Sequence, residues 1–267
     1  FKFMKIKLDQ LTSNEVSQLF VDKIKKMGLI LPVGCIEQHG PYLPLGCDMA
    51  IARKVSEVLA LNLKKNDLYQ AFVMPDCPYT PSPGAEHTMG TISVSFDLLG
   101  KNLFEIIKAA IRTPWDFIAI INAHAHNHGR VIETSIMGSS GCLGRTIPIV
   151  VINIYDFLNI AEDTGLNGGS HAGEMEIALY HHYFQDFQFK EAKIENKISK
   201  ERPSRIYGLE IMPRSYNGII SNGIPNLSRA LEKSKEVGQK INDAILTMLI
   251  ANLDNYFKCW CESNVEK

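Results

Sequence analysis

Three residues of types that commonly bind metals, Glu37, His39 and Asp48, follow a short apolar run near the start of the chain. The glycine and proline residues at 40–46 favour turns that would bring the three side chains to one place. Carboxylates and imidazoles together suit zinc, manganese or iron. The same residues also fit an ordinary loop in which Asp48 caps the following helix. These three residues alone leave both interpretations open.

A second group of polar residues, at 122–128, follows the apolar run at 117–121 and contains His124 and His126. A His-x-His pair at the end of a strand can chelate a metal. His124 is the candidate ligand, whereas His126 stays open as a ligand, as a residue that supports the ligands, or as a substrate contact.

A third group contains His171, Glu174 and Glu176 and begins a predicted helix. We expect His171 to be the general acid, because imidazole gives up a proton near neutral pH and a departing amide nitrogen needs one. Glu174 is assigned to the catalytic group as an orienting carboxylate, with a ligand role left open. Glu176 is the preferred metal ligand.

Together these residues predict a site for two divalent metal ions per chain. Asp48 would bridge the ions, with Glu37 and His124 completing one site and His39 and Glu176 the other. Two ions about 3.5 Å apart can share and deprotonate a water that attacks a carbonyl. Three carboxylates and a hydroxide would balance the four positive charges, so no large buried charge is left uncompensated.

The elements that must position these residues alternate between short apolar strands and helices. Strands are expected at 29–33, 71–74, 117–121 and 147–152, and helices at 49–63, 98–112, 131–139 and 227–257. This alternation predicts a largely parallel sheet with helices on both faces, with functional groups at the carboxyl ends of the strands. A polar stretch at 191–205 predicts an exposed excursion.

Composition narrows the possible functions. A length of 267 residues with 45% hydrophobic content fits a single domain over residues 1–267, and the net charge of −1 predicts neither a nucleic-acid nor a membrane partner. Without a run of roughly 20 apolar residues or an apolar leader, we expect a soluble, cytoplasmic protein that acts on a small molecule.

The six cysteines lack zinc-ribbon spacing and are interpreted as reduced thiols. Cys35 and Cys47 lie near the proposed site, but neither has a dedicated base for a nucleophilic role that a metal would not bind first.

The stretch at 34–48, GCIEQHGPYLPLGCD, resembles the signature G-x-x-E-Q-H-G-x-H-L-P-L-x-x-D of the creatininase (creatinine amidohydrolase) family and differs chiefly at Tyr42. The resemblance continues through Glu86-His87, 122–127, the segment from His171 to Glu176 and 218–225. It implies a three-layer α/β/α fold, often a hexamer, with metals held by residues matching Glu37, His39, Asp48 and His124.

Departures from the family pattern bear on the substrate. The position of a glutamate ligand in creatininase itself is His126 here, the usual Thr-Ser after Glu176 is Ile177-Ala178, and a tryptophan position is Asn167. Creatinine is therefore not the favoured substrate. The resemblance implies hydrolysis of a non-peptide carbon–nitrogen bond in a small cyclic amide or formamide. The alternatives are a metallopeptidase-like maturation enzyme of the same fold and a metal-binding homologue without activity.

Overall fold

A four-stranded parallel sheet forms the centre of the computed structural model, which describes residues 5–21, 24–139, 146–167, 171–190, 205–206, 209–210 and 225–265. The strand order is β2-β1-β3-β4, and the strands are β1 (Lys26–Val33), β2 (Tyr69–Val73), β3 (Phe117–Asn122) and β4 (Ile149–Asn153). Val33 is in register with Asn122, which is in register with Asn153. Three strands therefore end at the same level, and the loops that follow them begin side by side.

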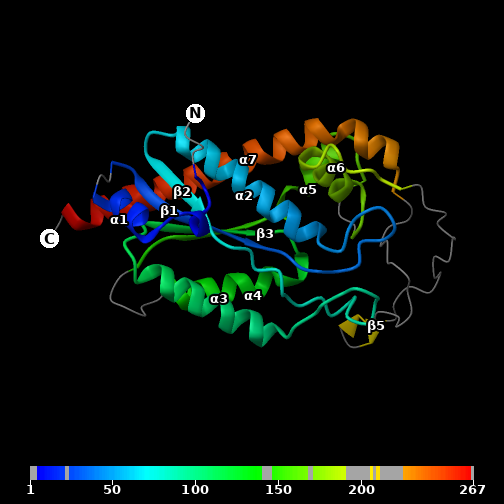
Figure 1. The fold of residues 1–267 in the computed structure, drawn as a ribbon, viewed down its shortest axis with the longest axis horizontal. Helices are drawn as coiled ribbons and strands as arrows, with labels where there is room; N and C mark the ends of the chain where they lie inside the picture. Colours follow the sequence, from blue (N-terminus) through cyan, green and yellow to red (C-terminus); the bar gives the residue numbers. More distant parts are fainter. Residues whose placement is uncertain are drawn as a thin grey trace.

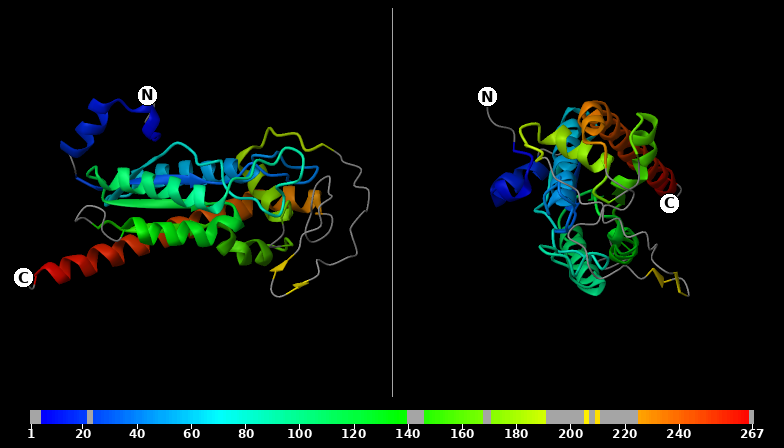
Figure 2. Two further views of the ribbon diagram at one scale, coloured as in Figure 1. Left: turned by 90° about the horizontal axis from the view of Figure 1, so that it is seen from below. Right: turned by 90° about the vertical axis from the view of Figure 1, so that its right-hand side faces the viewer.

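Helices cover both faces of this sheet. The α-helices are α1 (Ser13–Val21), α2 (Cys47–Lys65), α3 (Phe96–Ile111), α4 (His128–Ser139), α5 (Leu158–Asp163), α6 (Glu174–Tyr183) and α7 (Leu227–Val265), with short 3-10 turns η1 (Leu8–Gln10), η2 (Ala125–Asn127) and η3 (Ile154–Phe157). Figure 1 shows α2 and α7 on one face and α3 and α4 on the other, and the end-on view of Figure 2 shows the same three layers. The predicted mostly parallel α/β/α fold is confirmed.

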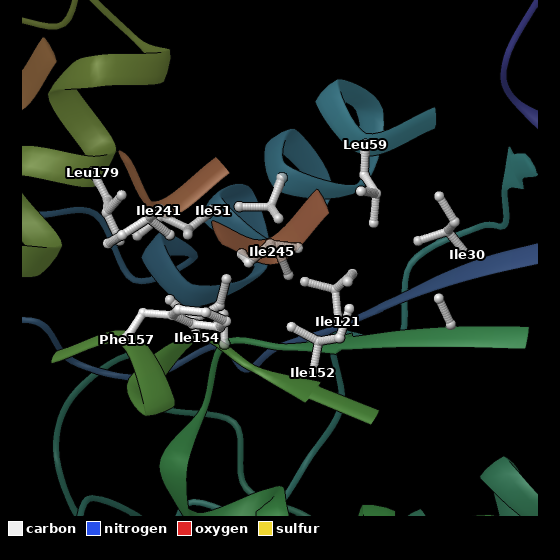
Figure 3. Packing of buried hydrophobic residues seen from close by; sticks show 14 of the residues in the cluster. Ile30, Ile51, Leu59, Ile121, Ile152, Ile154, Phe157, Leu179, Ile241 and Ile245 are labelled. Carbon is white, nitrogen blue, oxygen red and sulfur yellow. The ribbon is translucent and has the colours of Figure 1, made fainter. Parts of the chain in front are cut away.

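Alternation along the central strand explains the two-sided core. In β3, Phe117, Ala119 and Ile121 belong to the hydrophobic cluster beneath α2 and α7, while Ile118 and Ile120 belong to the cluster against α3 and α4. Successive strand residues point to opposite faces, so a strand buried on both faces is apolar throughout. Figure 3 shows Ile121 and Ile152 of the sheet facing Ile245 of α7.

The long C-terminal helix presents one apolar stripe to this core. Val237, Ile241, Ile245, Leu249 and Leu253 recur every four residues, and all are fully buried. Gly238 lies against the ring of His182 from α6, where a Cβ atom would come within 2.2 Å of that ring. The glycine thus lets α6 and α7 pack closely.

A separate two-stranded antiparallel sheet pairs β5 (Arg205–Ile206) with β6 (Leu209–Glu210). The predicted excursion at 191–205 lies outside the described residues except for Arg205. Among the described residues, no helix is both long and apolar enough to cross a membrane.

Candidate metal centre

The carboxyl ends of β1 and β3 and the first turns of α2 and α6 bring five predicted ligands together. Glu37 and His39 lie in the loop after β1, Asp48 lies in the first turn of α2, His124 follows β3, and Glu176 lies in the first turn of α6. All five are buried, with at most 3% of each residue exposed. Buried groups of this kind must be paired or must bind a metal.

Gly34 allows the end of β1 to approach the start of α2 closely. A Cβ atom at this position would lie 2.6 Å from both the Cα and the N of Met49 and 2.9 Å from the carbonyl carbon of Asp48. Such distances exclude any side chain unless the backbone moves. The glycine therefore sets how near Asp48 comes to the residues that follow β1.

Asp48 lies between two imidazoles. Its Oδ1 is 2.9 Å from Nε2 of His39, and its Oδ2 is 2.9 Å from Nδ1 of His124. Burial alone would raise the pKa of Asp48, but the two histidines hold it well below its usual range. Burial alone would lower the pKa of His39, but Asp48 and then Glu176 raise it to about 10. The two carboxylates therefore favour the protonated form of His39.

The first group of possible ligands contains Glu37, Asp48, His124 and, in addition, Cys35. Nδ1 of His124 is 3.4 Å from Oε2 of Glu37. Its other nitrogen, Nε2, faces the carbonyl oxygen of Pro81 at 3.0 Å. This contact fixes the ring so that Nδ1 points into the pocket, as an outer contact does for a metal-binding histidine.

The second group contains His39, His171 and Glu176. Nε2 of His39 is 3.9 Å from Oε2 of Glu176, and its Nδ1 donates to the carbonyl oxygen of Glu37 at 2.9 Å. Glu176 accepts hydrogen bonds from the Tyr155 hydroxyl and, at 2.6 Å, from the backbone N–H of Ala172. Both contacts hold the carboxylate in place.

Ala172 has an uncommon backbone conformation, with a φ of 56°. An alanine in this left-handed region costs of order 1 kcal/mol. The conformation lets its N–H reach Glu176, so backbone strain lies directly beside the site.

The predicted general acid, His171, lies at the edge of the second group. Its ring centre is 4.5 Å from that of His39, and its Nε2 is 2.6 Å from the carbonyl oxygen of Gln38 and 2.9 Å from the side-chain nitrogen of that residue. His171 is partly exposed, whereas His39 and Glu176 are buried. It is therefore the member of this group that a substrate can reach. Its catalytic role stays a prediction.

Glu174 lies outside the groups of possible metal ligands among the described residues. Its Oε1 accepts from Nη2 of Arg229 at 2.6 Å, and its Oε2 accepts from Nε of Arg229 at 2.9 Å. The backbone N–H groups of Asn226 and Asn167 also donate to it, at 2.9 and 3.0 Å. These contacts join the start of α6 to the start of α7. The orienting role expected for Glu174 stays a prediction.

His126 also lies outside those groups. It is exposed, and its ring centre is 5.2 Å from that of His124. Of the three residues left open for the second position, His126, Glu174 and Glu176, the arrangement of the described residues favours Glu176, which forms a group with His39.

Sequence reasoning missed several residues that contact the site. Cys35 was considered only as a nucleophile, yet it stands two residues before Glu37, and residues two apart on an extended chain share a face. That spacing was a usable signal. Tyr155, Pro81 and Gln38 gave none, because their contacts depend on loops that no local pattern specifies.

Comparisons with known proteins agree with this geometry. A family model described as creatinine amidohydrolase matches residues 9–253. The mycofactocin precursor peptide peptidase of Mycobacterium tuberculosis is 32% identical over 106 residues, which are 38% of this chain and 41% of that protein. The protein of the same description from Mycolicibacterium smegmatis is 33% identical over 100 residues, or 37% and 40% of the two chains. The matches thus span about two-fifths of these relatives.

Solved structures share the fold. A structure described as creatininase Mn has a TM-score of 0.68 and 19% identity, with 95% of this chain and 99% of that chain covered. A mutant creatininase described as Zn–Zn type gives the same values. At this identity the likeness establishes the fold alone. Because the family model covers most of its length, the chain belongs to the creatininase family.

Proposed function

We propose that this chain is a metal-dependent amidohydrolase that cleaves a non-peptide carbon–nitrogen bond in a small cyclic amide or formamide. The observation that carries the proposal is the position of Asp48, whose two oxygens each lie 2.9 Å from a different imidazole. A carboxylate that faces two groups of ligands is what a pair of divalent ions about 3.5–4 Å apart requires. Membership of the creatininase family supports hydrolysis as the reaction.

The donor atoms fit two ions of zinc, manganese or iron. One oxygen of Asp48 would join Glu37 and His124 in the first site. The other oxygen would join His39 and Glu176 in the second site. When bound, the ions would supply Lewis acidity toward the amide carbonyl and would lower the pKa of water.

The proton needed by the departing nitrogen would come from His171. This ring lies at the exposed side of the second group, and Gln38 holds its Nε2 at 2.6 Å. Imidazole is suited to proton transfer near neutral pH. Tyr155 and the N–H of Ala172 keep Glu176 turned toward His39, so the second ion site keeps its shape during turnover.

A second candidate is a peptidase of the same fold. It is supported by the two mycobacterial relatives, which are described as peptide peptidases and are 32–33% identical over the matched regions. A homo-oligomer, including the hexamer implied by the family, and a cytoplasmic location stay predictions.

Elemental analysis of the wild-type protein and of Asp48→Ala tests the two-metal proposal. We expect close to two ions per wild-type chain and the loss of both in the variant, because one carboxylate serves both sites. Asp254→Ala is the control, since Asp254 also accepts a hydrogen bond, from the Tyr69 hydroxyl at 2.6 Å, but contacts no proposed ligand. One ion fully retained in Asp48→Ala would show that Asp48 is not a bridge.

Hydrolysis assays of the metal-loaded protein decide between the substrates. Ring opening of small cyclic amides, or release of formate and an amine from formamides, would support the amidohydrolase. Cleavage of peptides alone would support the peptidase. Full metal occupancy without either activity would indicate a metal-binding homologue that is not an enzyme.

A further inference from the structure

Cys35 is a buried thiol in the pocket of the first group of ligands. Its Sγ is 3.0 Å from Oδ2 of Asp48, 3.3 Å from Nδ1 of His124 and 3.6 Å from Oε2 of Glu37. Without a metal, the thiol donates to Asp48. The proposed hydrolysis mechanism assigns no role to this thiol.

The spacing of these four atoms is close to that of a metal-binding tetrahedron. With metal–ligand distances near 2.0–2.1 Å for nitrogen and oxygen and 2.3 Å for sulfur, neighbouring ligands of tetrahedral zinc lie about 3.3–3.6 Å apart. The three sulfur distances fall at 3.0–3.6 Å, and Nδ1 of His124 lies 2.9 Å from Asp48 and 3.4 Å from Glu37. A small ion fits among the four atoms with only minor adjustment.

We propose that Cys35 is a fourth ligand of the first metal position, bound through its thiolate sulfur, and that it makes this position prefer zinc to manganese. The inference rests on the proposed function, and because four protein ligands would fill a tetrahedral zinc site, the reacting water would bind at the second position, which has three protein ligands. A sulfur–metal bond would form as the S–H bond breaks, and the proton would leave to solvent, because a bound dication deprotonates a coordinating thiol.

The expected preference of the first metal position for zinc over manganese follows from the chemistry of its ligand atoms. Thiolate is a soft ligand that zinc accepts, whereas manganese prefers carboxylates and water. The second group, with His39, His171 and Glu176, has no sulfur atom. Cys47 forms another group with His39 and Asp48, which are two of the ligands proposed for the second position, so it is the competing sulfur that the Cys47→Ser variant below must test. The two positions would therefore differ in metal preference.

Cobalt(II) as a substitute for zinc tests the inference, because a thiolate ligand gives an intense charge-transfer band in the near ultraviolet. Metal-free protein is titrated with cobalt, and bound cobalt is measured by elemental analysis alongside the spectrum. We expect the band in the wild-type protein and its loss in Cys35→Ser. Cys77→Ser should keep the band, since Cys77 is equally buried but contacts Asn102 in the core on the other face of the sheet.

The Kd values for zinc and manganese test the proposed preference for zinc separately. The zinc Kd of the first position should rise by at least about tenfold in Cys35→Ser, the lower end of what even outer contacts cost. The manganese Kd should change much less. Circular dichroism confirms that the variants are folded. Should Cys35→Ser fail to fold, Cys47→Ser decides: a band that persists in that variant supports Cys35, and a band that is lost there overturns its role.

The outcomes separate the two proposals. Bound cobalt without a charge-transfer band, or a band that persists in Cys35→Ser and disappears in Cys47→Ser, overturns the role of Cys35 and leaves the metal site intact. A chain that binds no cobalt, zinc or manganese overturns the proposed function, and the role of Cys35 falls with it.

Discussion

Replacing Gly34 by alanine should damage the site by moving the start of α2. The added Cβ would lie 2.6 Å from two backbone atoms of Met49, whereas ordinary contacts begin at 3.4 Å. The backbone must therefore move by about 0.8 Å, because no flexible side chain can yield instead. Asp48 precedes Met49 and must move with it. A displacement of that size directly away from one of the two histidines would stretch its 2.9 Å contact with Asp48 to about 3.7 Å, beyond hydrogen-bonding range.

The same overlap gives the expected loss of stability. Overpacking a tight core costs about 1–3 kcal/mol, and for a chain of this size each kcal/mol lowers the Tm by roughly 2–4 °C. We therefore expect Gly34→Ala to unfold roughly 2–12 °C below the wild type, and to bind less metal than the wild type at equal total metal. Differential scanning calorimetry of the metal-free protein gives the first quantity, and elemental analysis after dialysis gives the second.

Gly129→Ala in α4 is the matched control. A Cβ at that position meets nothing within 4 Å. Its stability should stay the same or rise by up to about 1 kcal/mol, because alanine is the better helix former. If Gly34→Ala kept the wild-type Tm and full metal content, the close approach of β1 to α2 would not position Asp48, and the reasoning would be wrong.

Three further predictions test other parts of the site. His171→Ala should keep its metal content but lower turnover by roughly 10²-fold, measured with any substrate found; unchanged turnover across pH would exclude His171 as the acid. Metal binding should release a proton from His39, whose pKa is about 10 without metal. The Kd of the second metal position should then fall roughly tenfold for each unit by which the pH rises between 7 and 9, measured against a competing chelator, and a pH-independent Kd would contradict this. The contacts of Glu174 with Arg229 predict that Glu174→Gln lowers stability by about 2 kcal/mol in urea unfolding and keeps both metal and turnover; a stable but inactive variant would instead support the catalytic role.

The sequence predicted the centres of the main elements well and their ends less well. The strand expected at 29–33 begins at Lys26 in the structure. The prediction started too late because Lys26 and Gly28 are not part of the apolar run, although both pair with residues of β2. The helix expected from residue 131 begins at His128 in the structure. The prediction started too late because the first turn of this helix is polar. Hydrophobic patterns locate what is buried, whereas the ends depend on pairing and capping.

The part of the candidate site that could be predicted consists of residues whose positions are fixed by the ends of the strands. Glu37 and His124 follow neighbouring strands whose last residues, Val33 and Asn122, are in register, so their meeting follows from the parallel sheet. The contact between Tyr155 and Glu176 does not follow from that topology. It depends on how the segment after β4 folds back, which no periodic pattern in the sequence encodes.

The rotation of α6 about its axis determines which of Glu174 and Glu176 faces the metal pocket. Side chains two residues apart on an α-helix differ in direction by about 200°, so both glutamates cannot face one pocket. Glu176 faces His39, and Glu174 faces Arg229 on the other side of α6. The sequence placed both near the site but did not give the rotation of the helix. That rotation is set by the packing of α6 against α7, where Gly238 makes room for His182. A ligand of the second metal position therefore depends on a packing contact made by the C-terminal helix.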